Sequence, residues 1–275
     1  MRYLRSSVIF ILMGLCSLPA FALEGKPLRF GSVARDSLAV MQVRLLPLTA
    51  YLSKSLGQPV ELRLSTNMSR AINALSSGNV DIAYLTPVAY IKAHAKGGVQ
   101  LVVRTVTDHR PSFKLMIIVR QDSPIHTVQQ LAGKRFAFGD PAALLQRAVV
   151  VGAGMPLQRL GKYSFVDHYD NVIRGVLVGD YDAGIVLDST ARRWEGRGIR
   201  VLYASENLPP YNIAVSSKID HATVKRLRDA LLRLDVSTPA DMSIIHTLDQ
   251  SYTGFAPATD ADYDIVRKLI KPFTQ

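Results

Sequence analysis

The sequence predicts an α/β fold made of two lobes, with mixed but mostly parallel sheets and a ligand cleft between the lobes. Short apolar strands alternate with helical patterns along most of the chain, which is typical of mostly parallel sheets. A polar break at residues 108–112 and a Pro-Pro pair at 209–210 bracket a central block. We therefore expect residues 23–107 and 210–275 to form one lobe and residues 108–209 the other, with the two crossings as a hinge.

In the first lobe, helices are predicted where apolar residues recur at every third or fourth position, and strands where short apolar or alternating runs occur. The run from Leu38 to Leu56 has the helical spacing, and Gly57 ends it. Pro47 interrupts this run, so a break or a fresh helix start is expected there. The expected strands are residues 28–33, 60–65, 80–85 and 99–106, and two further helices are expected after residues 66–67 and 86.

The second lobe is predicted to begin with a strand at residues 113–120, whose nearly continuous apolar run is typical of burial on both faces. Further strands are expected at residues 133–138, 165–166, 183–187 and 201–203, and helices at 127–131, from about 142, at 170–177 and from 188. In the returning segment, a strand is expected at 212–216 and helices at 222–234, 240–248 and 260–270.

Residues 78–90 combine a Gly-Asn turn signal, a short apolar strand and a helix start. Thr86 suits the N-cap, and Pro87 suits the first turn, where a missing N–H costs nothing. Ligands collect at such junctions in open α/β sheets, because backbone N–H groups and the helix dipole face the crevice. The alternative is an ordinary strand–helix unit in which Tyr90 packs in the core without a ligand role, since fold geometry alone does not establish function.

The first 22 residues are predicted to be a cleavable signal peptide. Two arginines precede an apolar stretch too short to span a bilayer, and an Ala-Phe-Ala cleavage site ends it. We expect the mature chain to begin at Leu23 in the periplasm, with an uncleaved anchor or a lipoprotein attached through Cys16 as alternatives. Cys16 is the only cysteine of the chain, so the mature protein has no thiol for a disulfide, a thiolate metal site or cysteine catalysis.

The charge pattern and the absence of catalytic motifs argue against nucleic-acid binding and against an enzyme. The net charge of +11, from 33 basic and 22 acidic residues, suits anionic ligands or an anionic envelope. The basic residues are scattered, which together with the export signal argues against nucleic acid. No G-x-S-x-G or H-E-x-x-H motif occurs, and the six histidines show no close metal-ligand spacing. We therefore expect no catalysis and no cofactor.

Six short motifs occur in a characteristic order over most of the mature chain. They are residues 28–31, 47–52 with 56–57, 78–83, 86–90, 131–141 and 179–184. With this ordered set the chain resembles the periplasmic substrate-binding proteins of phosphate, phosphite and phosphonate ABC transporters, which are type II periplasmic binding proteins. The resemblance implies a monomer that captures a small anionic or polar solute by closure of its lobes and passes it to an inner-membrane permease.

The resemblance also implies ligand contacts. Tyr90 matches a ligand-contacting tyrosine of the family, and Asp188 matches an aspartate that faces the cleft. A family histidine at a helix start corresponds to His168 or Tyr169, and this choice stays open because helix boundaries shift by a residue or more. Asp188 fits equally well as an N-cap. Arg35, in the first strand-to-helix loop, can pair with an oxyanion through two hydrogen bonds, or it is an ordinary surface arginine.

One loop departs from the family pattern. In members that bind phosphonates, an Asp-Pro pair is followed by a Ser-Thr-Ser-Gly run whose hydroxyls hold the anion. Here the pair at residues 140–141 is followed by Ala142, Ala143 and two leucines, so only backbone N–H groups remain as donors. Each lost charge-assisted bond is worth about 1.5–3 kcal/mol. We therefore expect this protein to bind phosphonates more weakly than micromolar.

Three functions remain after these observations. The first is solute capture for an ABC transporter. The second is ligand sensing by an accessory protein that docks on a membrane sensor kinase or cyclase, which the altered loop also suits. The third is an exported enzyme.

Overall fold

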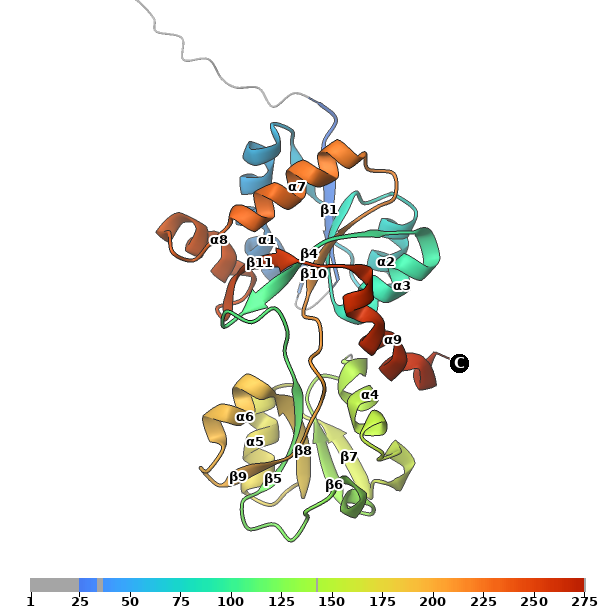
Figure 1. Cartoon of the computed structure of the whole chain (residues 1–275), viewed down its shortest axis with the longest axis vertical. Coiled ribbons are helices and arrows are strands. Elements are labelled where there is room, and N and C mark those ends of the chain that lie inside the picture. The colour runs from blue at the N-terminus through green and yellow to red at the C-terminus, as the bar shows by residue number, and fades with distance from the viewer. Residues whose placement is uncertain (1–24, 34–36, 142, 275) are drawn as a thin grey trace, which may run out of the picture.

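The computed structural model describes residues 25–33, 37–141 and 143–274. It contains two lobes, each built on one β-sheet, which are joined by two extended segments that pass between them (Figure 1). The expected signal peptide at residues 1–22 lies outside the described residues. Within the described part of the chain, none of the helices has both the length and the apolar character that a membrane crossing requires.

The first lobe holds a six-stranded sheet covered by helices on both faces. Its elements are β1 (Leu28–Ser32), α1 (Leu38–Leu56), β2 (Val60–Leu62), α2 (Met68–Ser76), β3 (Ile82–Leu85), α3 (Pro87–Gly97), β4 (Gln100–Thr107), β10 (Asn212–Val215), α7 (His221–Arg233), α8 (Pro239–Leu248) and β11 (Tyr252–Pro257). The strand order is β11-β4-β10-β3-β1-β2. Buried side chains of α1, α7 and α8 pack on one face, and those of α2 and α3 pack on the other.

The second lobe holds a five-stranded sheet in the order β7-β6-β8-β5-β9. Its elements are β5 (Leu115–Arg120), η1 (Val128–Leu131), β6 (Arg135–Phe138), α4 (Leu144–Gly152), η2 (Leu157–Arg159), β7 (Lys162–Phe165), α5 (Tyr169–Leu177), β8 (Ala183–Leu187), α6 (Asp188–Trp194) and β9 (Ile199–Ala204). Buried side chains of α4 pack on one face, and those of α5 and α6 pack on the other.

The sheets are mixed, and the expectation of mostly parallel pairing is wrong. Among the strand pairs of the described residues, four are parallel and five are antiparallel. Four of the five antiparallel pairs arise from the exchange of chain between the lobes. β5 enters from the first lobe and β10 returns from the second, and each runs antiparallel to both of its neighbours. Alternation of strands and helices predicts parallel pairing only where a helix connects neighbouring strands.

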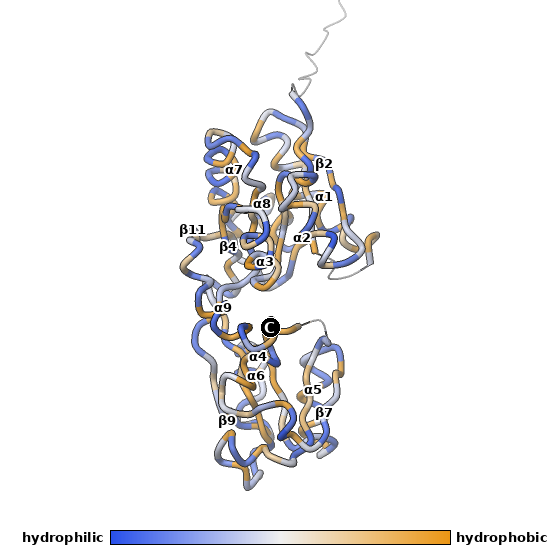
Figure 2. The backbone as a smooth tube through the Cα atoms, turned by 90° about the vertical axis from the view of Figure 1, so that its right-hand side faces the viewer, coloured by the Kyte–Doolittle hydropathy of each residue, from blue (hydrophilic) through white to orange (hydrophobic). Residues whose placement is uncertain are grey.

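The C-terminal segment bridges the two lobes. It consists of η3 (Asp260–Tyr263), α9 (Asp264–Ile270) and η4 (Lys271–Phe273). α9 packs against α3 of the first lobe and α4 of the second, between the lobes in both views (Figures 1 and 2). A Cβ atom on Gly152 would lie 2.7 Å from Leu269 Cδ2, so the missing side chain lets α4 and α9 approach closely.

Helix α1 is continuous through Pro47, so the expected break is wrong. A proline at position 47 leaves the carbonyl of Val43 without its helical partner. Val43 is 70% exposed, so water can satisfy that carbonyl. Proline is therefore tolerated here because the interrupted hydrogen bond faces solvent.

Candidate ligand-binding site

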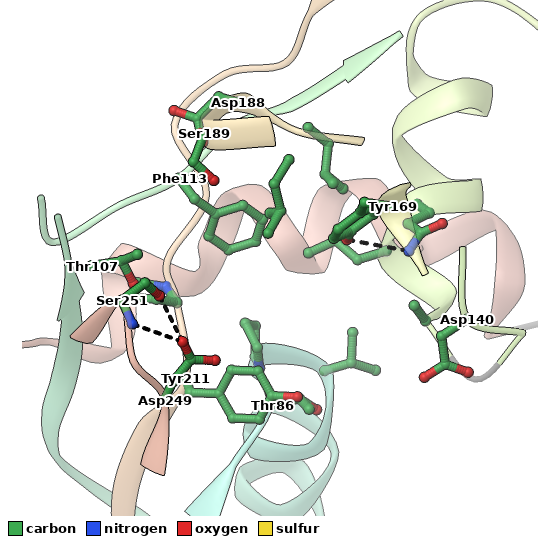
Figure 3. Close-up of a pocket in the computed structure, with 18 of the residues that line it drawn as sticks. Thr86, Thr107, Phe113, Asp140, Tyr169, Asp188, Ser189, Tyr211, Asp249 and Ser251 are labelled. Carbon is green, nitrogen blue, oxygen red and sulfur yellow. Dashed lines mark hydrogen bonds between the residues drawn. The ribbon is translucent and has the colours of Figure 1, made fainter. Parts of the chain in front are cut away.

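A cavity of about 910 Å³ lies between the lobes and is lined by residues of both, together with residues of the two crossing segments. The first lobe contributes residues of α1, α3 and β11, and the second contributes the starts of α4, α5 and α6. Figure 3 shows these side chains arranged around a common space. The volume falls within the range of about 300–1,000 Å³ that is usual for small-molecule sites.

Several helices begin at the cavity wall, and α3, α4 and α5 are three of them. α3 starts after β3, α4 after β6 and α5 after β7, and the first residues of all three line the cavity. Helix N-termini carry unpaired backbone N–H groups and the positive end of the helix dipole, so they favour anions. Thr86 stands at the first of these termini, where its hydroxyl oxygen accepts a hydrogen bond of 3.1 Å from the backbone N–H of Ala89. Helix N-termini of both lobes therefore meet at one cavity.

Charged side chains of both signs line the cavity. Among the described residues the basic ones are Arg44, Lys92, Arg110, Arg147 and Arg192, and the acidic ones are Asp108, Asp140, Asp167, Asp188 and Asp249. The five positive charges therefore meet five negative charges, in contrast to the net +11 of the whole chain. The cavity does not attract anions through excess charge, so its selectivity depends on where individual donors lie.

Asp188 is the first residue of α6 and not its N-cap, which is Leu187. The expected capping role is therefore wrong, because the helix begins directly from β8. The carboxylate Oδ2 instead lies 2.8 Å from Nη1 of Arg192, one turn further along the helix, and 3.9 Å from Nη1 of Arg110 in the first crossing segment. Asp188 faces the cavity as expected, but two arginines already balance its charge.

His168 and Tyr169 both line the cavity. His168 is the N-cap of α5, and Tyr169 is the first residue of the helix. The amide nitrogen of Gln146 donates to the Tyr169 hydroxyl over 3.3 Å (Figure 3). The amide oxygen of Gln146 accepts a bond of 2.8 Å from the backbone N–H of Gly139. Gln146 thus ties the end of β6 to the start of α5, and it positions the tyrosine at the wall.

Tyr90 is not among the residues that line the cavity. It is 1% exposed, and its hydroxyl donates to Asp260 Oδ1 over 2.7 Å. Its ring meets that of Tyr263 edge-on at 4.8 Å. Burial and the Asp260 carboxylate raise the pKa of the phenol, so Tyr90 stays protonated. The structure places it on the face of α3 that packs against the C-terminal segment, which differs from the expected ligand contact.

Of the other residues expected at the site, one lines the cavity and two lie outside the described residues. Ala143 lines the cavity as the N-cap of α4, without a side-chain capping bond. Arg35 and Ala142 lie outside the described residues. The cavity also contains Phe113 and Tyr211, which sequence reasoning missed. Both follow the breaks that mark the crossings, so their position beside the predicted hinge was the available signal.

Comparison with known proteins identifies the family. A family model described as "ABC transporter, phosphonate, periplasmic substrate-binding protein" matches residues 30–263. The chain belongs to this family. The predicted resemblance is thereby confirmed. The family consists of periplasmic substrate-binding proteins of ABC transporters, not enzymes.

Two curated members of this phosphonate-binding family share modest identity with the chain. The phosphate-import protein PhnD of Mycolicibacterium smegmatis is 22% identical over 277 residues, covering 90% of this chain and 86% of that protein. The phosphonates-binding periplasmic protein of Escherichia coli is 30% identical over 129 residues, covering 45% of this chain and 38% of that protein.

Solved structures confirm the predicted two-lobe, type II fold. XAC2383 from Xanthomonas citri bound to ATP has a TM-score of 0.72 and 21% identity, with coverage of 89% of this chain and 96% of that one. PhnD1 from Prochlorococcus marinus in complex with methylphosphonate has a TM-score of 0.69 and 17% identity, with coverage of 90% and 98%. At these identities the likeness shows the fold alone.

Proposed function

We propose that the protein captures a small oxyanion, of the phosphate, phosphite or phosphonate type or a related polar solute, in the cavity between its lobes. It then delivers the solute to an inner-membrane ABC permease. The observation that carries this proposal is the meeting of helix N-termini from both lobes at one cavity, among them α3 from the first lobe and α4 and α5 from the second. An anion there is bound by dipoles and N–H groups that neither lobe supplies alone.

Capture works through closure of the lobes about the two crossings. Residues 23–107 and 210–275 move as one lobe against residues 108–209. A ligand that contacts both lobes binds the closed form better than the open form, and it shifts the population toward closure by that difference in affinity. The permease then recognises the closed protein. The working unit is a monomer of the mature chain, exported by its signal peptide and without a cofactor.

The proposed contacts come from both lobes. The first lobe supplies Thr86, and the second supplies Ala143, His168 and Tyr169. Arg35 and Ala142 are proposed from the sequence and the family resemblance alone. Asp188 lines the same cavity, where its carboxylate offsets the charges of Arg192 and Arg110.

A thermal-shift screen of the mature chain, residues 23–275, tests this function. The panel holds phosphate, phosphite, methylphosphonate, aminoethylphosphonate, phenylphosphonate, sulfate, arsenate and simple organic acids. Phosphorus oxyanions come first because relatives carry the names phosphate-import and phosphonates-binding protein. A ligand at 100 times its dissociation constant adds about 2.7 kcal/mol of stability, which raises the melting temperature measurably.

Two variants that each remove one positive charge provide the matched control. Arg192→Gln changes the cavity, whereas Arg63→Gln changes an arginine whose side chain is 60% exposed and which does not line the cavity. Only the first is expected to weaken a hit. No change in melting temperature with any member of the panel would overturn capture of an oxyanion. It would favour the accessory protein that docks on a membrane sensor, to be sought by pull-down from inner-membrane extracts.

A further inference from the structure

The two segments that cross between the lobes, residues 108–114 and 205–211, meet at the cavity. The part of the cavity wall that they form, with Phe113 and Tyr211, is called the floor below. The backbone N–H of Phe113 donates to the carbonyl of Leu208 over 3.0 Å, and the N–H of Leu208 donates to the carbonyl of Phe113 over 2.8 Å. This pair of hydrogen bonds joins the crossings side by side. The backbones of the two crossings are thus held against each other at Phe113.

Each crossing contributes one aromatic ring to the floor. Phe113 belongs to the first crossing and Tyr211 to the second, and the two rings enter the cavity from opposite sides (Figure 3). The Tyr211 ring is stacked on Tyr84 at a centroid distance of 4.9 Å. Tyr84 is itself held by a 2.7 Å hydrogen bond to the hydroxyl of Tyr252. A buried tyrosine pair thus supports Tyr211, which makes the ring a fixed surface.

Apolar side chains extend this floor toward the helix starts of the second lobe. Leu115 and Leu187 line the cavity beside Phe113, and Leu144 and Leu145 line it at the beginning of α4. These leucines of α4 stand where a ligand with many oxygens would need hydroxyl donors. A small, fully hydrated oxyanion finds no partner among them, and it would leave the apolar floor in contact with water.

We infer that the captured solute is an organic oxyanion with an apolar substituent, aryl or branched alkyl. The anionic group sits at the helix N-termini, and the substituent lies on the floor between Phe113 and Tyr211. This inference rests on the proposed function and specifies its ligand. Burial of the substituent replaces the binding energy that the missing hydroxyls would have supplied, because apolar area removed from water stabilises a complex. The preset floor adds affinity because no side chain needs to be ordered.

Calorimetric titration of the mature chain with a matched series of ligands tests the inference. The series is inorganic phosphate, methylphosphonate, phenylphosphonate, benzenesulfonate and the neutral benzyl alcohol. We expect phenylphosphonate to bind at least tenfold more tightly than methylphosphonate and benzyl alcohol to bind too weakly to measure. Phe113→Ala and Tyr211→Ala should each reduce the phenyl-to-methyl preference at least fivefold. Tyr163→Ala, which truncates a 41% exposed ring that does not line the cavity, should leave the preference unchanged.

The outcomes separate this inference from the proposed function. The preference is a ratio, so a folding defect, which weakens both ligands equally, does not imitate its loss. Binding of phosphate or methylphosphonate at least as tight as that of phenylphosphonate would overturn the inference and leave the proposed function standing. A preference that survives in both floor variants would also overturn it. Binding of benzyl alcohol alone, or of no member of the series, would overturn both.

Discussion

The phenol of Tyr90 donates a 2.7 Å hydrogen bond to Asp260, and this bond joins α3 of the first lobe to the C-terminal segment. Arg267 binds the same carboxylate and also reaches Asp264. Because α9 continues from this point onto α4, the network anchors the segment that bridges the lobes. The residue that the family resemblance assigned to the ligand thus serves the junction between the lobes.

Tyr90→Phe is expected to destabilise the protein by about 1 kcal/mol, since it removes one hydrogen bond while Arg267 still holds Asp260. The measurement is urea unfolding at pH 7. Tyr163→Phe is the control because that ring is 41% exposed, and it should change the free energy of unfolding by less than about 0.5 kcal/mol. If solute affinity fell tenfold in Tyr90→Phe with stability unchanged, Tyr90 would be a ligand contact after all.

Asp81, just before β3, and Arg29, in the neighbouring strand β1, form a two-pronged ion pair. The two bonds to the guanidinium are both 2.8 Å, and the backbone N–H of Arg29 donates to the same carboxylate. Burial opposes ionisation of Asp81, but the Arg29 bonds and charge outweigh it and lower the pKa of the carboxyl. Asp81→Asn should therefore destabilise the protein by about 2 kcal/mol at pH 7.

This loss should depend on pH. A carboxyl whose pKa is lowered in the folded state contributes stability in full above its unfolded pKa of about 3.9, and that contribution disappears as the pH falls through the folded pKa. The difference between wild type and Asp81→Asn should thus be constant from pH 7 to 5 and shrink below about pH 4. Glu61→Gln breaks the exposed pair with Arg63 and should change stability by under 0.5 kcal/mol. A difference independent of pH would contradict the ion pair as the cause.

Asp188 offers a test of charge in the cavity. Its carboxylate offsets Arg192 and Arg110, so Asp188→Asn should tighten binding of an oxyanion about three- to tenfold by leaving both arginines unopposed. Titration at low and at high salt checks this, because part of the gain should be screened. Complete loss of binding would instead show that Asp188 contacts the ligand directly, as it would with a solute that carries an amine.

The sequence predicted the order of strands and helices and the caps well, because these depend on local chemistry. Thr86 and Asn67 cap α3 and α2 as expected. Strand direction was mispredicted, because it depends on where the chain crosses between lobes. β11 was missed because it contains Gly254 and ends at Pro257. A proline is tolerated there since this strand lies at the sheet edge.

The candidate site was predictable only in part, because the sequence does not show which way a side chain points from its helix or loop. The helix starts at Thr86, Ala143 and His168 were found because strand-to-helix junctions converge at one edge of each sheet. Which face of a helix Tyr90 occupies is set by the C-terminal segment, more than 160 positions further along the chain. Phe113 and Tyr211 came together only through the pairing of two crossings that are distant in sequence.

The start of α4 allows the family's missing hydroxyls to be restored. Ala143 is the N-cap of this helix without a side-chain bond. The double variant Ala142→Ser with Ala143→Thr adds two hydroxyls, one of them at position 143, which lines the cavity. It should bind methylphosphonate at least tenfold more tightly than the wild type, because a hydrogen bond to a charged group is worth about 1.5–3 kcal/mol. A threonine at the N-cap should also stabilise the protein by about 1 kcal/mol.

Titration with methylphosphonate measures the first effect and urea unfolding the second. Ala50→Ser, on the exposed side of α1, adds a hydroxyl away from the cavity; it should leave the affinity unchanged and lower the stability by about 0.5 kcal/mol, since serine is a weaker helix former than alanine. A gain in stability without a gain in affinity would mean that the new hydroxyl is consumed by the helix cap and does not reach the anion. Micromolar binding of methylphosphonate by the unchanged protein would show that the backbone N–H groups of α3, α4 and α5 suffice. In that case the loop would have lost its hydroxyls without losing the family ligand.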